Sequence, residues 1–314
     1  MSSPALIGLD WGTTSFRAYR LDRQGAVLEA KSAAAGILKI PGGDFEAALE
    51  REIGPWLADA PGVPVIAAGM ITSRQGWVEV PYCSCPAGSA EIAGALLRHE
   101  TGAGRTIHFV PGLSIVGADG VPDVIRGEET QIIGAVGGAV GGEVGDAPGR
   151  RLLVLPGTHS KWALVEHGRL VWFATFMTGE LFAVLREHSI LGRLMAGADD
   201  DDAAYGRGLA YARGSGGLLR RLFSARTLCL FGELPERGVA SYLSGLLVGT
   251  ELREALECLG PSATDEEITV IGGAELCGRY LAAIEAAGLR GRRAAEDAGA
   301  RGLFVIARAA GLIR

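Results

Sequence analysis

A short phrase that occurs twice is the feature that most constrains how this chain folds. The two copies are Gly12-Thr13-Thr14-Ser15-Phe16-Arg17-Ala18 and Gly157-Thr158-His159-Ser160-Lys161-Trp162-Ala163. Each copy follows an apolar run and leads through alternating residues into a turn, a pattern that predicts two strands joined by a Gly-Thr turn. Because two unrelated hairpins would rarely share these residues at matched places, we expect two related domains, each headed by one hairpin.

Both turns suit a polyphosphate, since a Gly-Thr turn leaves backbone N–H groups free and adds hydroxyl donors. The two copies differ at one place: Asp10 precedes the first turn, whereas Leu155 stands at the aligned position of the second. Asp10 is therefore the predicted ligand of a hydrated Mg²⁺. An ordinary hairpin whose aspartate bonds its own turn is the alternative, and the second copy makes it less favoured. The predicted phosphate-binding residues are Gly12, Thr13, Thr14, Gly157, Thr158, His159 and Ser160.

Length and charge exclude several classes of protein. The 314 residues suffice for two domains with buried cores, and 48% hydrophobic with 21% charged residues is a globular composition. A net charge of −6 without a basic stripe argues against nucleic-acid binding. No apolar stretch reaches the ~18–20 residues of a membrane span, and no leader opens the chain. We therefore expect a cytoplasmic protein whose five scattered cysteines are reduced.

Apolar periodicity predicts the elements of both halves. The first half is expected to have strands at 5–10, 15–22, 26–33, 63–68 and 106–110, and helices at 44–57, 89–99 and 127–136. The second half is expected to have strands at 152–155, 161–166, 169–175 and 267–271, and helices at 178–197, 204–222, 235–259, 274–287 and 298–312. A glycine-rich linker at 137–149 places the boundary between domains 1–147 and 148–314. The run Asp199–Asp202 is most simply a helix cap or a surface loop.

Two further segments complete the predicted site. Gly272 and Gly273, between a strand and a helix, let a flat group approach the backbone, so we expect them to contact adenosine. A tight strand-to-helix connection is the alternative. Glu128, in the segment 126–131 at a helix start, is the predicted base that takes the proton of an acceptor hydroxyl. Glutamates in a first turn also merely complement the helix dipole, and Glu129 stays open as the base.

No P-loop motif occurs, and no Gly-x-Gly-x-x-Gly follows the first strand, so those two routes to a nucleotide are absent. The elements that do occur, in this order, resemble the sugar kinase, heat-shock ATPase and actin superfamily. More specifically, the chain resembles the 2-dehydro-3-deoxygalactonokinase family. The stretches that carry the resemblance are 9–14, 68–77, 126–131, 155–162 and 176–181, of which 156–162 (Pro-Gly-Thr-His-Ser-Lys-Trp) is the most specific. Glu128 stands where many sugar kinases of the superfamily have an aspartate.

The resemblance implies an α/β fold of two ribonuclease-H-like (actin-like ATPase) domains with a nucleotide cleft between them. It also implies ATP- and Mg²⁺-dependent phosphorylation of the terminal 6-hydroxyl of 2-dehydro-3-deoxy-D-galactonate, in galactonate catabolism. An acidic substrate needs a cation, preferably a guanidinium, for its carboxylate. Arg74 is the first candidate and Arg126 the second, with a structural ion pair as the alternative for each. The predicted substrate-binding residues are Thr72, Ser73, Arg74, Gln75 and Arg126.

Two other functions remain open at this point: a kinase for another sugar or sugar acid, and a non-catalytic actin-like ATP-binding protein. Glu128 beside Arg126 and the polar segment 72–77 favour a kinase, because a filament-forming protein needs neither. The galacto or gluco configuration of the substrate, its ring or open form, and a homo-oligomeric state are not fixed by the sequence.

Overall fold

The computed structural model describes residues 3–137, 149–196, 200–214, 216–260 and 265–313. These residues divide into two compact units. The first comprises Met1–Arg150, Ala163–Phe173 and Ala295–Arg314, and the second comprises Arg151–Trp162 and Ala174–Ala294. The expected boundary between residues 147 and 148 lies outside the described residues, so the division into domains 1–147 and 148–314 stays a prediction.

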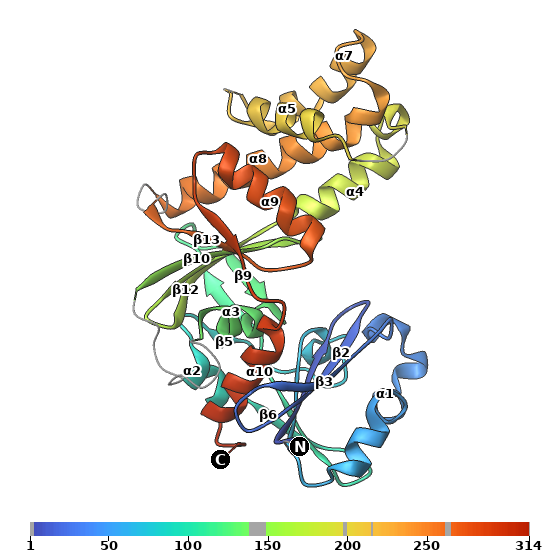
Figure 1. Cartoon of the computed structure of the whole chain (residues 1–314), viewed down its shortest axis with the longest axis vertical. Coiled ribbons are helices and arrows are strands. Elements are labelled where there is room, and N and C mark those ends of the chain that lie inside the picture. Colours follow the sequence, from blue (N-terminus) through green and yellow to red (C-terminus); the bar gives the residue numbers. More distant parts are fainter. Residues whose placement is uncertain (1–2, 138–148, 197–199, 215, 261–264, 314) are drawn as a thin grey trace. The chain divides into compact units, whose positions relative to one another are not determined.

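A six-stranded sheet with the order β3-β2-β1-β4-β7-β6 forms the centre of the first unit (Figure 1). Strand β1 pairs antiparallel with β2 and parallel with β4, so that Asp10 lies opposite Arg17 on one side and Ala68 on the other. The predicted strands of the first half are confirmed. The bounds of these strands are β1 Leu6–Trp11, β2 Phe16–Leu21, β3 Val27–Ala33, β4 Val65–Ala68 and β7 Thr106–Phe109, and the sixth strand, β6 Leu97–Glu100, was not predicted.

Aromatic packing on one face of this sheet fixes the end of β1. Trp11 is fully buried and meets Phe16 and Phe45 edge to face, with ring centroids 4.8 and 5.8 Å apart. Its indole N–H donates to the Ala35 carbonyl at 2.8 Å. Phe45 opens helix α1 (Phe45–Asp59), whose N-cap, Asp44, accepts from the Ala47 N–H at 3.0 Å.

The expected helix over 89–99 is wrong in its second half. Helix α2 ends after Ser89–Gly94, and Leu97–Glu100 forms β6, which pairs antiparallel with β7. Gly94 is a poor helix residue, and the alternating burial of 97–100 is the pattern of an edge strand. A small three-stranded sheet was also not predicted, because its strands are short. They are β5 Cys83–Ser84, β8 Leu113–Val116 and β9 Pro122–Ile125, in the order β5-β8-β9.

The second large sheet repeats the first. Its order is β12-β11-β10-β13-β14, so the first strand again has the second and third on one side and the fourth and fifth on the other. Strand β13 pairs parallel with both β10 and β14. The predicted duplication is confirmed, and the fold is α/β with two ribonuclease-H-like sheets. The bounds are β10 Arg150–Leu155, β11 Ser160–Glu166, β12 Arg169–Phe176, β13 Ile268–Val270 and β14 Gly291–Arg293.

Helices inserted into the second unit pack on one another through glycines. A Cβ on Gly208 would lie 2.2 Å from the Tyr242 carbonyl, and one on Gly245 would lie 2.1 Å from that of Tyr205, so helices α5 and α8 touch backbone to backbone. The helices of this unit are α4 Thr178–His188, α5 Asp202–Ala212, α6 Leu218–Leu222, α7 Ser224–Leu230, α8 Val239–Leu259 and α9 Ala274–Ala286.

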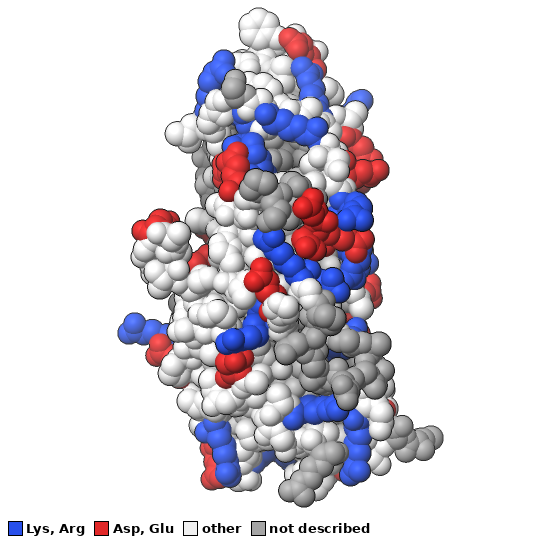
Figure 2. All heavy atoms as spheres, turned by 90° about the vertical axis from the view of Figure 1, so that its left-hand side faces the viewer, with Lys and Arg blue, Asp and Glu red and all other residues white. Residues whose placement is uncertain are grey.

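The surface carries charges of both signs. On the face in Figure 2, lysines and arginines alternate with aspartates and glutamates, with no patch of one sign. This mixture agrees with the absence of a basic stripe in the sequence. Within the described ranges, no helix combines the length and the apolar character that crossing a membrane requires.

Two glycines set the contact between helix α3 (Glu128–Val136) and the last helix, α10 (Ala298–Ala309), in the first unit. A Cβ on Gly302 would lie 1.7 Å from the Thr130 carbonyl oxygen, and one on Gly134 would lie 1.8 Å from that of Ala298. Both contacts are with backbone, which no side-chain rotation relieves. Helix α3 starts at Glu128, so this contact also supports the predicted base.

We expect Gly302→Ala to destabilise the protein, because the new methyl group forces α3 and α10 apart. The expected loss is about 2–3 kcal/mol, the upper part of the range for overpacked sites. Gly299→Ala on the same helix is the matched control: its Cβ would meet nothing nearer than Gln131 Cγ at 3.8 Å. Alanine there should stabilise by about 0.5–1 kcal/mol through helix propensity. Urea unfolding of both variants checks the pair, and equal midpoints would contradict it.

Candidate active site

The first Gly-Thr turn is oriented by a loop that the sequence did not reveal. The carbonyl oxygens of Gly12, Thr13 and Thr14 accept hydrogen bonds from the N–H groups of Ile37, Leu38 and Gly36, at 3.0, 3.3 and 3.2 Å. Thr13 and Thr14 are exposed. Because the carbonyls are used within the protein, the N–H groups and hydroxyls of these two threonines are what the turn offers to an anion.

Gly36 allows this contact. A Cβ on it would lie 2.3 Å from the Thr14 carbonyl carbon and 2.4 Å from the Thr13 oxygen, so any side chain would push the loop off the turn. The one signal in the sequence is a glycine after three alanines. In a chain with 48 glycines that signal carries little weight.

The ends of β1 and β4 and the start of α3 converge in the first unit. Gly69 follows β4 with φ 94°, and a Cβ there would lie 2.9 Å from the Trp11 carbonyl and 3.4 Å from Asp10 Oδ1. Gly127, with φ 109°, precedes Glu128, and its Cβ would lie 3.2 Å from Gly69 Cα. Two glycine backbones thus meet where the predicted metal ligand and the predicted base emerge.

Both burial and neighbouring charges affect the pKa of the Asp10 carboxyl group. Its Oδ2 accepts from Arg17 Nη1 at 3.2 Å, and its side chain is 14% exposed. Burial raises the pKa of Asp10, Arg17 opposes that rise, and the nearby charge of Glu128 adds to it. The structure therefore brings Asp10 and Glu128, predicted from separate motifs, within electrostatic reach of each other.

The two glutamates at the start of α3 have different surroundings. Glu128 is half-buried, and its Oε2 accepts from the Arg126 N–H at 2.9 Å. Glu129 is 1% exposed; its Oε2 accepts from the Gly127 N–H at 2.6 Å, and its buried Oε1 has no hydrogen-bond partner among the described residues. Burial, with the charge of Glu128 adding to it, raises the pKa of Glu129 to about 8. Glu129 is therefore a neutral acid near pH 7.

The predicted substrate residues separate into internal and exposed groups. The guanidinium of Arg126 is held inside the protein. Its Nη1 donates to the Thr72 carbonyl and hydroxyl, each at 2.6 Å, and its Nη2 donates to the Val80 carbonyl at 3.0 Å. The guanidinium also lies over the Tyr82 ring, 4.2 Å from its centroid. Arg74, by contrast, is exposed and forms no hydrogen bond or ion pair within the described part of the chain.

The neighbours of Arg74 follow the same division. Thr72 is fully buried and donates to the Gly69 carbonyl at 3.0 Å, and the Ser73 hydroxyl donates to the Met70 carbonyl at 2.7 Å. Gln75 is exposed. The loop thus uses its hydroxyl groups to hold its own shape after β4 and presents the longer side chains outward.

The second Gly-Thr turn packs against the start of α4. A Cβ on Gly179 would lie 2.3 Å from the Gly157 carbonyl oxygen, and the Glu180 N–H donates to the Thr158 carbonyl at 2.9 Å. His159 Nε2 and Glu180 Oε2 form a hydrogen bond, with both side chains half-exposed. The segment 176–181, which carried part of the resemblance, is therefore the support of this turn.

Ser160 and Lys161 point away from that surface. Lys161 is buried, and its Nζ donates to the His159 carbonyl at 2.8 Å. Ser160 is fully buried, and its hydroxyl donates to Glu251 Oε1 at 2.7 Å. Glu251 on α8 was not identified from the sequence, where it is one more acid within a long apolar helix.

A pocket of about 440 Å³ opens in the second unit beside this turn. Gly157 and Thr158 form one part of its wall, and the rest comes from α4, α8 and α9. The predicted adenosine contacts, Gly272 and Gly273, stand directly before α9 and are exposed, but the lining is made by later residues of that helix. The lining residues outside the turn are Thr178, Gly179, Phe182, Ala183, Arg186, Ser244, Leu247, Val248, Glu275, Leu276, Arg279 and Tyr280.

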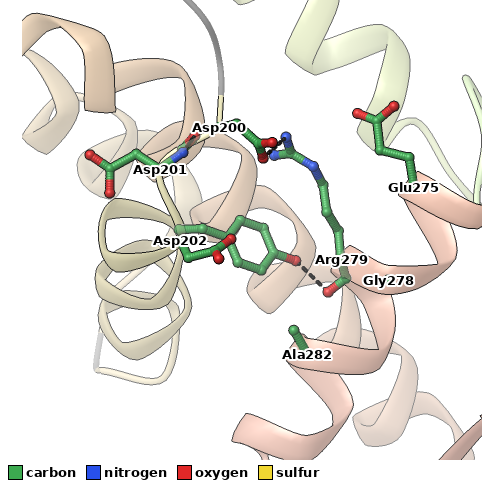
Figure 3. Close-up of a pocket in the computed structure, with 9 residues that line it drawn as sticks. Asp200, Asp201, Asp202, Glu275, Gly278, Arg279 and Ala282 are labelled. Carbon is green, nitrogen blue, oxygen red and sulfur yellow. Dashed lines mark hydrogen bonds and ion pairs between the residues drawn. The ribbon is translucent and has the colours of Figure 1, made fainter.

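A smaller pocket of about 190 Å³ holds the acidic run (Figure 3). Asp201 caps helix α5 by accepting from the Ala204 N–H at 2.9 Å, which confirms the cap reading of this run. Asp200 pairs with Arg279 at 3.6 Å, and Asp199 lies outside the described residues. In the described ranges, no three His, Cys, Asp or Glu side chains are grouped to hold a metal ion.

Comparison with known proteins shows which family the chain belongs to. A family model described as 2-keto-3-deoxy-galactonokinase matches residues 10–306. The 2-dehydro-3-deoxygalactonokinase of Escherichia coli K12 is 35% identical over 282 residues, 90% of each chain, and a Rhizobium meliloti relative assigned the same activity is 35% identical over 306 residues, 96% of each. A crystal structure of a Sinorhizobium meliloti protein assigned this activity matches with a TM-score of 0.85 at 35% identity, covering 97% of this chain and 98% of that one. The motif-based assignment is confirmed, and the chain belongs to the 2-keto-3-deoxy-galactonokinase family.

Proposed function

We propose that this protein transfers the γ-phosphoryl group of ATP to the terminal 6-hydroxyl of 2-dehydro-3-deoxy-D-galactonate, giving 2-dehydro-3-deoxy-6-phosphogalactonate. Its family and its relatives' activity support a kinase that uses ATP on a sugar acid. The observation that supports the proposal is the convergence of Asp10 and Glu128 at the Gly69–Gly127 contact, since these are the proposed metal ligand and the proposed base. The cytoplasmic location stays part of this proposal, because the reaction draws on the ATP pool.

The arrangement also bears on the rival functions. A non-catalytic ATP-binding protein has no need of a second carboxylate beside Asp10, or of a charged side chain kept exposed on the 72–77 loop. A kinase for a different sugar acid would keep both features. The choice between acids therefore rests on the family, and it is the part of the proposal that a substrate panel tests.

Mg²⁺ fits the residues present. Asp10 is a carboxylate with limited exposure at a strand end, and Mg²⁺ in kinases is held by one or two carboxylates, with waters and substrate phosphates completing the shell. A bound Mg²⁺ would neutralise charge on the phosphoryl oxygens. Thr13 and Thr14 at the first Gly-Thr turn, and Gly157, Thr158 and His159 at the second, are the proposed ligands of phosphate oxygens. Ser160, with its hydroxyl on Glu251, would contribute through its backbone.

Glu128 is the better candidate for the base. A base must reach the acceptor hydroxyl and be ionised at the working pH. Glu128 is half-buried beside Asp10, whereas Glu129 is enclosed and neutral near pH 7. The proposed mechanism is thus proton removal by Glu128 with positioning of both substrates, and the residues around it serve mainly to exclude water and orient groups.

Purified protein with ATP and Mg²⁺ should phosphorylate 2-dehydro-3-deoxy-D-galactonate faster than the gluco isomer or plain hexoses. We expect Glu128→Gln to lower kcat about 10²–10⁴-fold, the usual contribution of a general base, while ATP binding stays near that of the wild type. Coupled ADP release measures turnover, and calorimetry measures binding. Absence of turnover with every keto-deoxy acid would refute the substrate. Loss of turnover in Glu129→Gln, with Glu128→Gln active, would mean that the other glutamate is the base.

Glu129 should make the protein less stable as the pH rises. The pKa of Glu129 is about 8 in the folded state, above the ordinary value of 4.5. The contribution of Glu129 to the free energy of unfolding is therefore complete below pH 4.5 and is lost as the pH rises towards 8. Glu129→Gln mimics the neutral acid and removes this dependence. Between pH 5.5 and 7.5 we expect the wild type to lose about 2.5 kcal/mol relative to the variant. Urea unfolding at both pH values measures it, and parallel changes would show that Glu129 is already charged.

Arg74 is the proposed partner of the substrate carboxylate. It is exposed, while the guanidinium of Arg126 is held by Thr72 and Val80. A guanidinium matches a carboxylate with two parallel hydrogen bonds. Arg126 then has the role of fixing the loop that carries Arg74.

We expect Arg74→Gln to raise the KM for the sugar acid about ten- to a hundredfold, the loss of one charge-assisted interaction, with the KM for ATP unchanged. Arg23→Gln is the matched control: Arg23 is an exposed arginine of the same unit, in the turn at the far end of strand β2. Steady-state kinetics with each substrate varied in turn separates the two constants. An unchanged KM for the sugar acid would remove Arg74 from the substrate site.

A further inference from the structure

Glu251 is a buried carboxylate that collects hydrogen bonds from three separate segments of the second unit. It is 2% exposed. Its Oε1 accepts from the Ser160 hydroxyl at 2.7 Å and the Trp162 indole N–H at 2.8 Å, and its Oε2 accepts from the Tyr280 hydroxyl at 2.7 Å. The Thr178 side chain also hydrogen-bonds to it. These four partners match the roughly four acceptor positions that a carboxylate has.

Two of the four partners line the 440 Å³ pocket, and the other two follow the turn that forms part of its wall. Ser160 and Trp162 lie on β11, directly after the Gly157-Thr158 turn. Thr178 is the first residue of α4, and Tyr280 lies on α9; both line the pocket. Helix α8, which carries Glu251, packs against both α4 and α9 (Figure 1). One side chain behind the pocket thus joins every segment that forms its wall.

This arrangement holds only when all three segments are in place. Burial raises the pKa of Glu251, and the four hydrogen bonds act against that rise. A buried acceptor that loses a donor costs the full penalty of an unsatisfied polar group, so moving one segment is opposed by the bonds of the others. A nucleotide phosphate at the Gly157-Thr158 turn would meet a surface that is already in position, and preorganisation raises affinity.

We propose that Glu251 is a positioning residue for the nucleotide, which holds the second Gly-Thr turn in register with the α4 and α9 walls of the pocket. This inference rests on the proposed function, because it takes the pocket to be the nucleotide site. Glu251 touches no ligand itself. Its influence passes through Ser160 to the turn, and through Thr178 and Tyr280 to the pocket wall.

Glu251→Gln tests the proposal with little change of shape. The Trp162 N–H can only donate, so the amide oxygen takes the side of Ser160 and Trp162, and the Tyr280 and Thr178 hydroxyls must turn to accept from the amide nitrogen. The network also loses its charge, so it is weakened and not emptied. We expect the Kd for MgADP and the KM for ATP to rise about tenfold, the effect of about one lost charge-assisted hydrogen bond. The KM for the sugar acid should stay within twofold, because that site lies on the first unit.

Thr250→Val is the matched control. Thr250 is the buried neighbour of Glu251 on α8, and its hydroxyl donates to the Leu246 carbonyl of the same helix at 2.7 Å, without reaching the pocket segments. It should bind MgADP like the wild type even where it lowers the melting temperature. A merely structural Glu251 would behave in the same way, so unchanged MgADP affinity in folded Glu251→Gln overturns the proposal.

Tyr280→Phe keeps the ring and removes one donor, which provides a test if Glu251→Gln does not fold. We expect its Kd for MgADP to rise about three- to tenfold, and the double variant to lose less than the product of the two single effects, since both act in one network. An unchanged Kd in Tyr280→Phe, or multiplicative losses in the double variant, would overturn the proposal. Wild-type protein that neither binds MgADP nor turns over would instead refute the proposed function.

Discussion

Close approach of backbones at glycines is the constraint on which both parts of the site depend. Gly69 and Gly127 meet so closely that the start of α3 reaches the end of β1, and this contact brings Glu128 to Asp10. Close backbone approach recurs at each Gly-Thr turn, where Gly36 contacts Thr14 and Gly179 contacts Gly157. A Cβ on Gly69, Gly36 or Gly179 would lie less than 3.0 Å from backbone, a separation that real Cβ atoms avoid, and one on Gly127 would lie 3.2 Å away, which is also tight.

The two sheets share one strand order, yet their Gly-Thr turns are supported differently. In the first unit the loop at 36–38 takes up the turn's carbonyls, and strand β1 supplies Asp10. In the second unit, Leu155 stands in place of the carboxylate. The turn packs against α4, and Ser160, which follows it, hydrogen-bonds to Glu251. The hairpin is thus present in both copies, while the proposed metal ligand stands in the first copy and the 440 Å³ pocket opens beside the second.

Much of this was predictable from the sequence, because the hairpin phrase, the strand alternation and the glutamates at a helix start are local patterns. The parts that were missed depend on distant segments. Gly36 matters through a contact with Thr14, and Glu251 through partners up to 91 residues away, none of which a local pattern encodes. Strand β6 was hidden for a related reason: its pairing with β7 outweighed a helical reading of residues 89–99.

Burial gives two adjacent acids different surroundings, and this difference favours the binding of anionic substrates. Glu128 and Glu129 follow one another on α3, but only Glu129 is enclosed, and its raised pKa keeps it uncharged near neutral pH. A charged Glu129 would add a negative charge behind Asp10 and Glu128, where a sugar-acid carboxylate and ATP phosphates are proposed to approach. Repulsion between like charges grows as the local dielectric falls, so a neutral Glu129 favours the binding of both anions. The destabilisation expected as the pH rises from 4.5 towards 8 is the consequence of placing an acid there, since over this range the unfolded chain releases the proton that the folded protein keeps.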